Sequence, residues 1–190
     1  MGEPELKRMT ADEFLDWQQS QEQNYELVDG LPALPLKSMT GASHAHDRVV
    51  VNIIASLHGQ LRRKPCRPTT DDIALKIPAG NVRRADLLVE CGSVDLKRAA
   101  AVEPRLAVEV LSRSTMGTDR IRKVEEYKTI SSLAYILLVD TERPQITFYA
   151  READAWLVRF IDDLDAVIDL PAIECRLAAR DIFEGLPFAE

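Results

Sequence analysis

Residues 106–111 constrain the fold more than any other part of this sequence, because five of these six residues are apolar. A short, bounded apolar run of this kind predicts a strand that is buried on both faces, at the centre of a sheet. Residues 135–139 form a similar run, and a helical pattern at about residues 117–130 separates the two. This order predicts two parallel strands joined by a right-handed crossover.

The first third of the chain predicts a helix, a hairpin and a second helix. Thr10 and Glu13 have the spacing of a capping box, which predicts a helix from Thr10 to about residue 19. The pair Asp29-Gly30 predicts a hairpin turn, and Pro32 shortens the return strand. Apolar residues at helical spacing predict an amphipathic helix over residues 43–63.

The remaining pattern completes a fold of the α/β (α+β) class, with a mixed central sheet flanked by helices. We expect one domain over residues 1–190, with a core at about residues 10–160 and an acidic extension at 161–190. The further predicted elements are strands at 73–77, 85–89, 145–149 and 156–161, shorter strands near 168 and 173, and a helical turn at 181–185.

The formal net charge of −7 is concentrated in the last 40 or so residues. Residues 1–150 hold 20 Lys and Arg against 21 Asp and Glu, whereas residues 151–190 hold 4 against 10. This balance argues against tight non-specific DNA binding and leaves room for a weaker or metal-assisted contact. Local basic clusters are predicted to be solvated faces, at residues 62–64 with Arg67, at 83–84 and at 120–123.

Three widely separated cysteines, Cys66, Cys91 and Cys175, form no Cys-x-x-Cys pair. Their odd number and spacing predict free thiols rather than a disulfide framework or a zinc ribbon. No apolar run reaches the roughly 18 to 20 residues that span a membrane, and no signal-peptide pattern follows the N-terminal basic residues. We therefore expect a cytoplasmic protein without a membrane partner.

Two carboxylates interrupt apolar strand patterns. Asp86 precedes the apolar run 87–89, and Glu109 lies inside the run 106–111. A carboxylate in a buried strand is costly unless it is paired, hydrogen-bonded or bound to a metal. Two such strands side by side would bring both carboxylates to one place, which suits Mg²⁺. The alternative is that each carboxylate pairs with a buried arginine or caps a strand end.

The predicted crossover helix adds a third group. Asp119, Lys123 and Tyr127 are spaced four residues apart and so share one helix face. Lys123 at that face would orient a water nucleophile or stabilise charge on a phosphate. The alternative is a surface pair of Asp119 and Lys123 that contributes a few tenths of a kcal/mol. Among the histidines, His44 and His46 lack a third ligand at useful spacing, so zinc binding is not expected.

Several segments together resemble the Uma2 family, bacterial proteins once grouped as a domain of unknown function and assigned to the PD-(D/E)XK restriction-endonuclease-like fold. The resemblance covers about residues 10–160, and its most distinctive part joins Glu109-Val-Leu-Ser-x-Ser-Thr to Asp119-Arg-x-x-Lys. The segments are Tyr25-Glu-Leu-Val-Asp-Gly30, Ala85-Asp86, Pro104-Arg-Leu-Ala-Val-Glu109-Val-Leu-Ser-Arg-Ser-Thr115, Asp119-Arg120-x-x-Lys123-x-x-x-Tyr127 and Tyr135-Ile-Leu-Leu-Val-Asp140.

The resemblance implies roles for individual residues. Asp86 and Glu109 would be the metal ligands, and Glu26 would add a ligand or an outer contact. The family's usual lysine, two residues after the second ligand, is replaced by Leu111, and Lys123 is the implied substitute. The candidate substrate contacts are His46, Arg120 and Tyr127. The chain departs from the family at Ala85, where proline is usual, at Arg113 and at residues 131–134.

The activity that the resemblance implies is that of an endonuclease that hydrolyses DNA phosphodiester bonds with Mg²⁺ or Mn²⁺. Analogy with the fold predicts a homodimer, in which two sites cut two strands. One rival hypothesis is a catalytically silent module on the same fold that binds nucleic acid or protein. Another is a structural or regulatory protein in which Glu109 is a paired core carboxylate.

Overall fold

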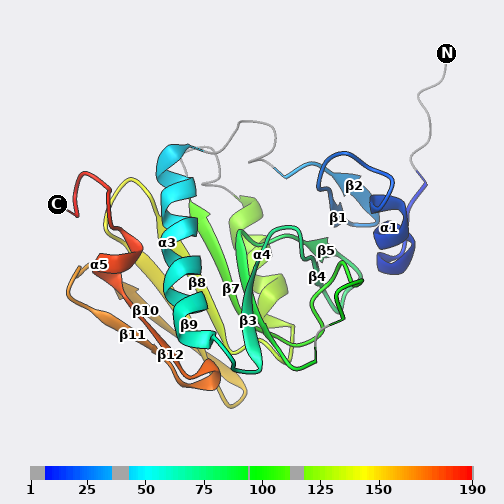
Figure 1. The fold of residues 1–190 in the computed structure, drawn as a ribbon. Helices are drawn as coiled ribbons and strands as arrows, with labels where there is room; N and C mark the ends of the chain where they lie inside the picture. Colours follow the sequence, from blue (N-terminus) through cyan, green and yellow to red (C-terminus); the bar gives the residue numbers. More distant parts are fainter. Residues whose placement is uncertain (1–6, 36–42, 94, 112–117, 190) are drawn as a thin grey trace.

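The computed structural model describes residues 7–35, 43–93, 95–111 and 118–189. At its centre is a six-stranded sheet, in the order β10-β9-β8-β7-β6-β3, between the helices α3 (His44–Leu61) and α4 (Thr118–Lys128) (Figure 1). Its strands are β3 (Cys66–Thr70), β6 (Leu87–Cys91), β7 (Pro104–Leu111), β8 (Tyr135–Asp140), β9 (Ile146–Glu152) and β10 (Ala155–Ile161). The predicted mixed sheet flanked by helices is confirmed.

The two central strands have the predicted direction. β7 and β8 are parallel, in a register that pairs Val108 with Leu137, and α4 lies in the crossover between them. The other neighbouring strands of this sheet are antiparallel. Glu109 lies two residues before the carboxyl end of β7.

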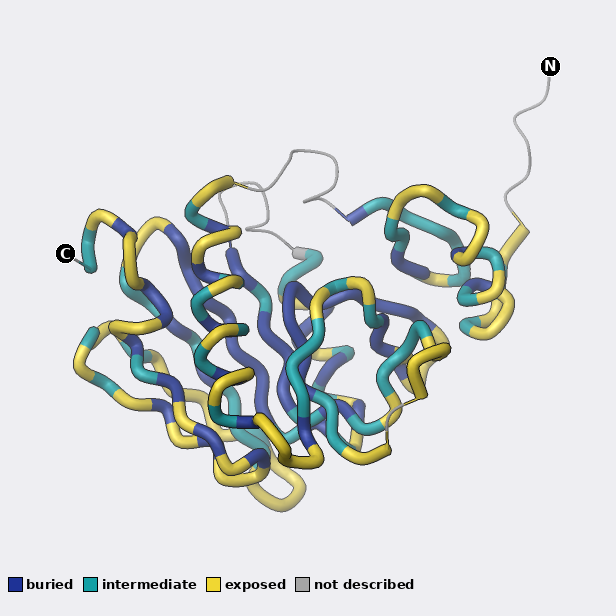
Figure 2. Tube along the Cα trace, in the orientation of Figure 1, coloured by how far each residue is buried: buried dark blue, intermediate teal, exposed yellow. Residues whose placement is uncertain are grey.

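Two hydrophobic cores cover the two faces of this sheet, because successive residues of a strand point to opposite faces. Val108 packs in the cluster that contains Ile53 of α3, whereas Ala107 packs in the cluster that contains Val124 of α4. Figure 2 shows the result as continuous buried segments in the central strands and alternating buried and exposed turns along α3. The apolar run at residues 106–111 is buried on both sides for this reason.

A second sheet, in the order β2-β1-β5-β4, lies next to α1 (Ala11–Gln18) (Figure 1). Thr10 and Glu13 form the predicted capping box at the start of α1. The predicted Asp29-Gly30 turn is also present, with φ angles of 52° at Asp29 and 80° at Gly30. Glycine adopts such left-handed values without strain, and aspartate adopts them more readily than most residues. The strands are β1 (Glu26–Val28), β2 (Leu31–Ala33), β4 (Leu75–Lys76) and β5 (Val82–Arg83).

The C-terminal residues form a separate unit that packs on α3. It consists of β11 (Val167–Leu170), a 3₁₀ turn η2 (Pro171–Ile173), β12 (Cys175–Ala178) and α5 (Ala179–Ile182). Its apolar residues, among them Ile168 and Phe183, belong to the same core cluster as Ile53. The acidic extension thus contributes to the core on the α3 side.

The prediction of three free thiols is wrong at two positions. Cys66 and Cys91 form a disulfide, because antiparallel pairing of β3 with β6 places these two residues directly opposite each other. Cys175 is a buried free thiol, as predicted.

The prediction of strands before β6 is also partly wrong. β3 escapes prediction, since Pro68 and two threonines give it no apolar alternation; as the edge strand of its sheet it tolerates a proline. The strand predicted at residues 73–77 is reduced to β4, which pairs within the small sheet. In the part of the chain that the structure describes, no helix is both long and apolar enough to cross a membrane.

Candidate active site

Asp86 and Glu109 lie on neighbouring strands of the central sheet. The antiparallel register that pairs Leu87 with Val108 sets Asp86, one residue before β6, next to Glu109 of β7. Asp86 is 5% exposed, and its Oδ2 accepts a hydrogen bond of 2.8 Å from the backbone N–H of Val110. The structure therefore brings together the two carboxylates that interrupt apolar runs.

α3 contributes His46 to the same place. Its Nε2 lies 3.3 Å from Asp86 Oδ2, and the residue is buried. The Ser43 hydroxyl, which caps α3, accepts the backbone N–H of His46, so the first turn of this helix is fixed. His46 thus reaches the carboxylate of Asp86, which lies 40 residues further along the chain.

α4 contributes Lys123 and Tyr127. The Tyr127 hydroxyl donates a hydrogen bond of 2.5 Å to Glu109 Oε1, and Lys123 Nζ lies 3.6 Å from the same oxygen. Tyr127 is fully buried and Lys123 is 8% exposed. The alternative in which Lys123 forms a surface pair is therefore wrong, because α4 turns this face toward the sheet.

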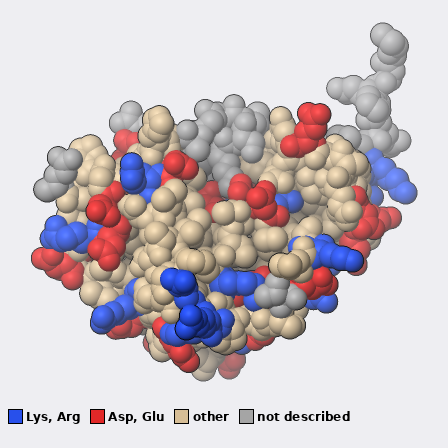
Figure 3. All heavy atoms as spheres, viewed as in Figure 1, with Lys and Arg blue, Asp and Glu red and all other residues tan. Residues whose placement is uncertain are grey.

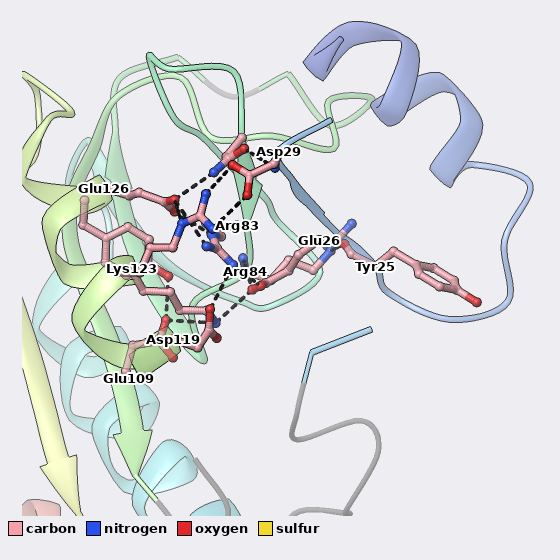
Figure 4. A network of polar contacts seen from close by, with 12 residues as sticks. Tyr25, Glu26, Asp29, Arg83, Arg84, Glu109, Asp119, Lys123 and Glu126 are labelled. Atoms are coloured by element: carbon pink, nitrogen blue, oxygen red, sulfur yellow. Dashed lines mark hydrogen bonds and ion pairs between the residues drawn. The ribbon is translucent and has the colours of Figure 1, made fainter. Parts of the chain in front are cut away.

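Glu26 approaches from the small sheet. Its Oε1 lies 2.9 Å from Lys123 Nζ and accepts the backbone N–H of Arg84 at 3.0 Å. Its Oε2 accepts a hydrogen bond of 3.0 Å from Arg83. Figure 4 shows Lys123 extending from α4 between Glu109 and Glu26. Both oxygens of Glu26 thus already have protein donors, an arrangement that favours the predicted outer contact over the predicted metal ligand.

Arg83 contacts three carboxylates, and Figure 4 shows it among them. Its Nη1 also lies 3.3 Å from Asp119, and its Nε lies 2.6 Å from Glu126. We call Glu26, Arg83, Asp119 and Glu126 the Arg83 network. The prediction of a solvated basic face at residues 83–84 is wrong, since Arg83 and Arg84 are 1% and 2% exposed. Sequence reasoning missed this network, because its members come from distant segments.

Burial and neighbouring charges shift the pKa values in opposite directions. Burial raises the pKa of Glu109 to about 7; Lys123 opposes this rise and the negative charge of Asp86 adds to it. Burial by itself would lower the pKa of Lys123, but Glu109 and Glu26 outweigh it and raise that pKa. Burial also opposes ionisation of Glu26, yet Lys123 and the Arg84 N–H lower its pKa overall. Lys123 is thus held as a cation.

The chemistry of Asp86 and Glu109 fits a hard divalent cation. Among the described residues, no group of three or more His, Cys, Asp or Glu side chains is placed to hold a metal ion. Mg²⁺ is nevertheless often bound by one or two carboxylates, with waters and substrate phosphates completing its shell. The repulsion from Asp86 that raises the pKa of Glu109 is also what a bound cation would offset. We therefore take this carboxylate pair as the candidate metal site.

Other predicted residues lie outside this cluster. Arg120 is half-buried on the first turn of α4, and in the described part of the chain no contact joins it to Asp86, Glu109 or Lys123. The basic residues 62–64 follow the opposite end of α3, roughly 24 Å from His46 at 1.5 Å per helical residue. In Figure 3, Lys and Arg gather below that end of α3, and elsewhere on this face charges of both signs are interspersed. Arg113 lies outside the described residues.

The fold of this chain is shared with a solved structure. The structure is similar to a crystal structure from Anabaena variabilis ATCC 29413, described as that of a "putative nuclease belonging to DUF820", with a TM-score of 0.70 and 16% sequence identity. The similarity covers 94% of this chain and 99% of that chain, which shows a shared fold.

Two uncharacterized proteins of Synechocystis sp. are similar in sequence. The protein slr1290 is 28% identical over 184 residues, which is 95% of this chain and 94% of that protein. The protein sll1609 is 28% identical over 157 residues, which is 80% of this chain and 86% of that protein. The model of the Uma2 family, described as "Putative restriction endonuclease", matches residues 11–180. By this match, and by the segments around Glu109 and Lys123 noted above, the chain belongs to the Uma2 family.

Proposed function

We propose that this protein is a divalent-metal-dependent nuclease that hydrolyses phosphodiester bonds in DNA. One observation carries the proposal: a buried ammonium, Lys123, lies 3.6 Å from the half-buried carboxylate of Glu109, which neighbours a second carboxylate, Asp86. Negative charge develops on the oxygens of a phosphate during hydrolysis. A lysine cation beside a carboxylate pair that can bind a metal ion would stabilise that charge. The descriptions of the family and of the structural neighbour support a nuclease.

Asp86 and Glu109 would hold Mg²⁺ or Mn²⁺. When bound, such an ion neutralises phosphate charge and lowers the pKa of water. Tyr127 fixes the orientation of Glu109, and the Val110 N–H fixes that of Asp86. Both carboxylates are thereby held before substrate arrives, which reduces the cost of ordering them in the reaction.

Lys123 acts as a cation in this proposal and does not act as a general base. Its two carboxylate neighbours raise its pKa, so the ammonium keeps its proton near neutral pH. It can donate hydrogen bonds to the attacking water or to a phosphate oxygen and stabilise the charge that forms there. His46, which lies beside Asp86, is a further candidate for a contact with substrate.

A specific observation favours one rival, the catalytically silent binding module. The described residues contain no three-residue metal-binding group, and Glu109 Oε1 already has two protein partners. A module of this kind would bind DNA or protein equally well with and without a divalent cation. The homodimer and the cytoplasmic location stay predictions in either case.

The test of the nuclease proposal is a plasmid assay paired with calorimetry. We expect purified protein to nick supercoiled DNA with Mg²⁺ or Mn²⁺ and to be inactive in EDTA. Titration of Mn²⁺ into the metal-free protein should release or absorb heat in the wild type and much less in Glu109→Gln. Folded protein that neither cuts nor binds metal, yet binds DNA in EDTA, would replace the nuclease with the binding module.

A further inference from the structure

Arg83 has no part in the proposed chemistry, although it is among the largest fully buried side chains of the protein. Its guanidinium lies within 3.3 Å of three carboxylates, those of Glu26, Asp119 and Glu126. Removing a charged side chain and its charged partners from water is costly. Ionisable groups in such surroundings are concentrated at functional sites. The positions of its three carboxylate partners indicate which parts of the fold Arg83 holds together.

The three carboxylates belong to two different parts of the fold. Glu26 lies on β1 of the small sheet, whereas Asp119 and Glu126 lie on α4. Asp119 and Glu126 are seven residues apart, two helical turns, and Lys123 lies between them on the same face. Arg83 therefore ties the small sheet to the face of α4 that carries Lys123 (Figure 4).

The carboxylate of Glu26 connects Arg83 to Lys123 directly. Arg83 holds Oε2 of Glu26, and Lys123 lies against Oε1 of the same group. Glu26 can keep Lys123 within 3.6 Å of Glu109 only while its own rotation is restricted. The Arg83 side chain supplies that restriction on one side, and the backbone N–H of residue 84, which any side chain at that position leaves in place, supplies it on the other.

We infer that Arg83 is a positioning residue of the proposed nuclease: through Glu26 and the face of α4, it fixes the Lys123 ammonium beside Glu109. The inference rests on the proposed function. By this inference the small sheet β2-β1-β5-β4 belongs to the active site, because β5 supplies Arg83 and β1 supplies Glu26.

Only arginine matches this arrangement. Nε and Nη2 of Arg83 point to Glu126, while Nη1 points to Glu26 and Asp119. A lysine would keep the positive charge but offers a single ammonium in place of a planar fork. Arg83→Lys therefore removes the geometry and retains the charge, which is the change that the inference requires.

Arg84 provides a matched control. It is the next residue and is equally buried, and its guanidinium donates hydrogen bonds to the backbone carbonyls of Tyr25, Asp71 and Asp72. Arg84→Lys leaves the backbone N–H that Glu26 accepts. It therefore perturbs the same sheet and leaves the link to Lys123 intact.

The experiment measures kcat and KM for cutting of a DNA substrate with Mn²⁺, together with thermal unfolding, for both variants. We expect Arg83→Lys to lower kcat by about 10- to 100-fold with little change in KM, because outer contacts of a catalytic group have effects of this size. Arg84→Lys should lower the unfolding temperature comparably and keep kcat within about twofold of wild type.

Glu26→Gln tests the same link from its other end and serves if Arg83→Lys does not fold. We expect it to lower kcat as well, and the double variant to be no slower than the slower single variant, since both changes break one connection. Equal losses of kcat in Arg83→Lys and Arg84→Lys, no loss in Arg83→Lys, or additive losses in the double variant would overturn the inference. Wild-type protein that cuts no DNA would overturn the proposed function itself, and the inference with it.

Discussion

The hydroxyl of Tyr127 donates a 2.5 Å hydrogen bond to the carboxylate of Glu109, from the helix that covers one face of the sheet to a strand at its centre. Tyr127 is fully buried, and burial and the proximity of Glu109 both raise its pKa, so the hydroxyl stays a donor. The sequence suggests Tyr127 as a substrate contact; in the structure its side chain is fully buried and its hydroxyl donates to Glu109.

Tyr127→Phe removes this donor and retains the packing of the ring. We expect the affinity of metal-free protein for Mn²⁺ to fall by about 10-fold or more, as for other groups that orient metal ligands. The free energy of unfolding should fall by about 1–2 kcal/mol. Calorimetric titration of Mn²⁺ checks the first value, with Tyr149→Phe, a half-buried tyrosine of β9, as the control. An unchanged affinity would show that Glu109 is oriented without this bond.

The raised pKa of Glu109 predicts a pH dependence of stability in metal-free protein. Its pKa is about 7 in the folded state against 4.5 ordinarily, so the folded protein keeps this proton more tightly than the unfolded chain. Stability from this group is therefore fully present below pH 4.5, falls as the pH rises toward 7, and is constant above that.

Denaturant unfolding at about pH 5.5 and about pH 7.5 measures this effect in wild type and in Glu109→Gln. The glutamine variant cannot ionise at this position and does not lose this contribution. From the lower to the higher pH, the unfolding free energy of wild type should therefore fall relative to that of Glu109→Gln. An identical change of unfolding free energy in both proteins would contradict the assignment of this titration to Glu109.

The Cys66–Cys91 disulfide should stabilise the protein without affecting the chemistry. It closes a loop with a sequence separation of 25, for which the chain-entropy estimate is about 3.5 kcal/mol. Cys91 ends β6, whereas Asp86 precedes its start, roughly 17 Å away at the rise of an extended strand. We expect the double variant Cys66→Ala/Cys91→Ala to unfold at a lower temperature and to cut DNA at the wild-type rate. A large loss of cutting by folded protein would contradict this separation.

Arg151 is expected to matter for stability alone. Its guanidinium donates to the backbone carbonyls of Lys128, Ile130 and Leu133, at and just after the end of α4, and lies over the ring of Trp156. Arg151→Ala leaves these carbonyls without that donor and should reduce the unfolding free energy by about 2–3 kcal/mol. Below its unfolding temperature the variant should keep the metal affinity of the wild type, as calorimetry would show.

Strong local patterns in the sequence predict the parts of the fold that carry the site. The apolar runs around Val108 and Leu137 predict the parallel central strands, and the capping residues Thr10 and Ser43 mark where two helices begin. Asp86 and Glu109 are identifiable because a carboxylate in an apolar run needs a physical reason to be there.

The features that escape prediction depend on contacts between distant segments. Arg83 resembles part of a solvated cluster, because nothing near it in sequence reveals that Glu26 and Glu126 meet it in the folded protein. The disulfide likewise depends on the register of β3, a strand whose composition gives no strand pattern. Tertiary pairing decides both, and local sequence does not encode it.

The most direct test of the central claim is the initial rate of plasmid nicking with Mn²⁺ by wild type, Glu109→Gln, Lys123→Met and Lys128→Met. Lys128 lies on the same helix and pairs with Glu125 at its surface, so it controls for the loss of a lysine from α4. We predict that Glu109→Gln and Lys123→Met each lose at least about 100-fold in rate, the size expected for groups that stabilise the transition state. Lys128→Met should cut like wild type. Full cutting by folded Glu109→Gln or Lys123→Met would contradict the account, because the site would then lie elsewhere.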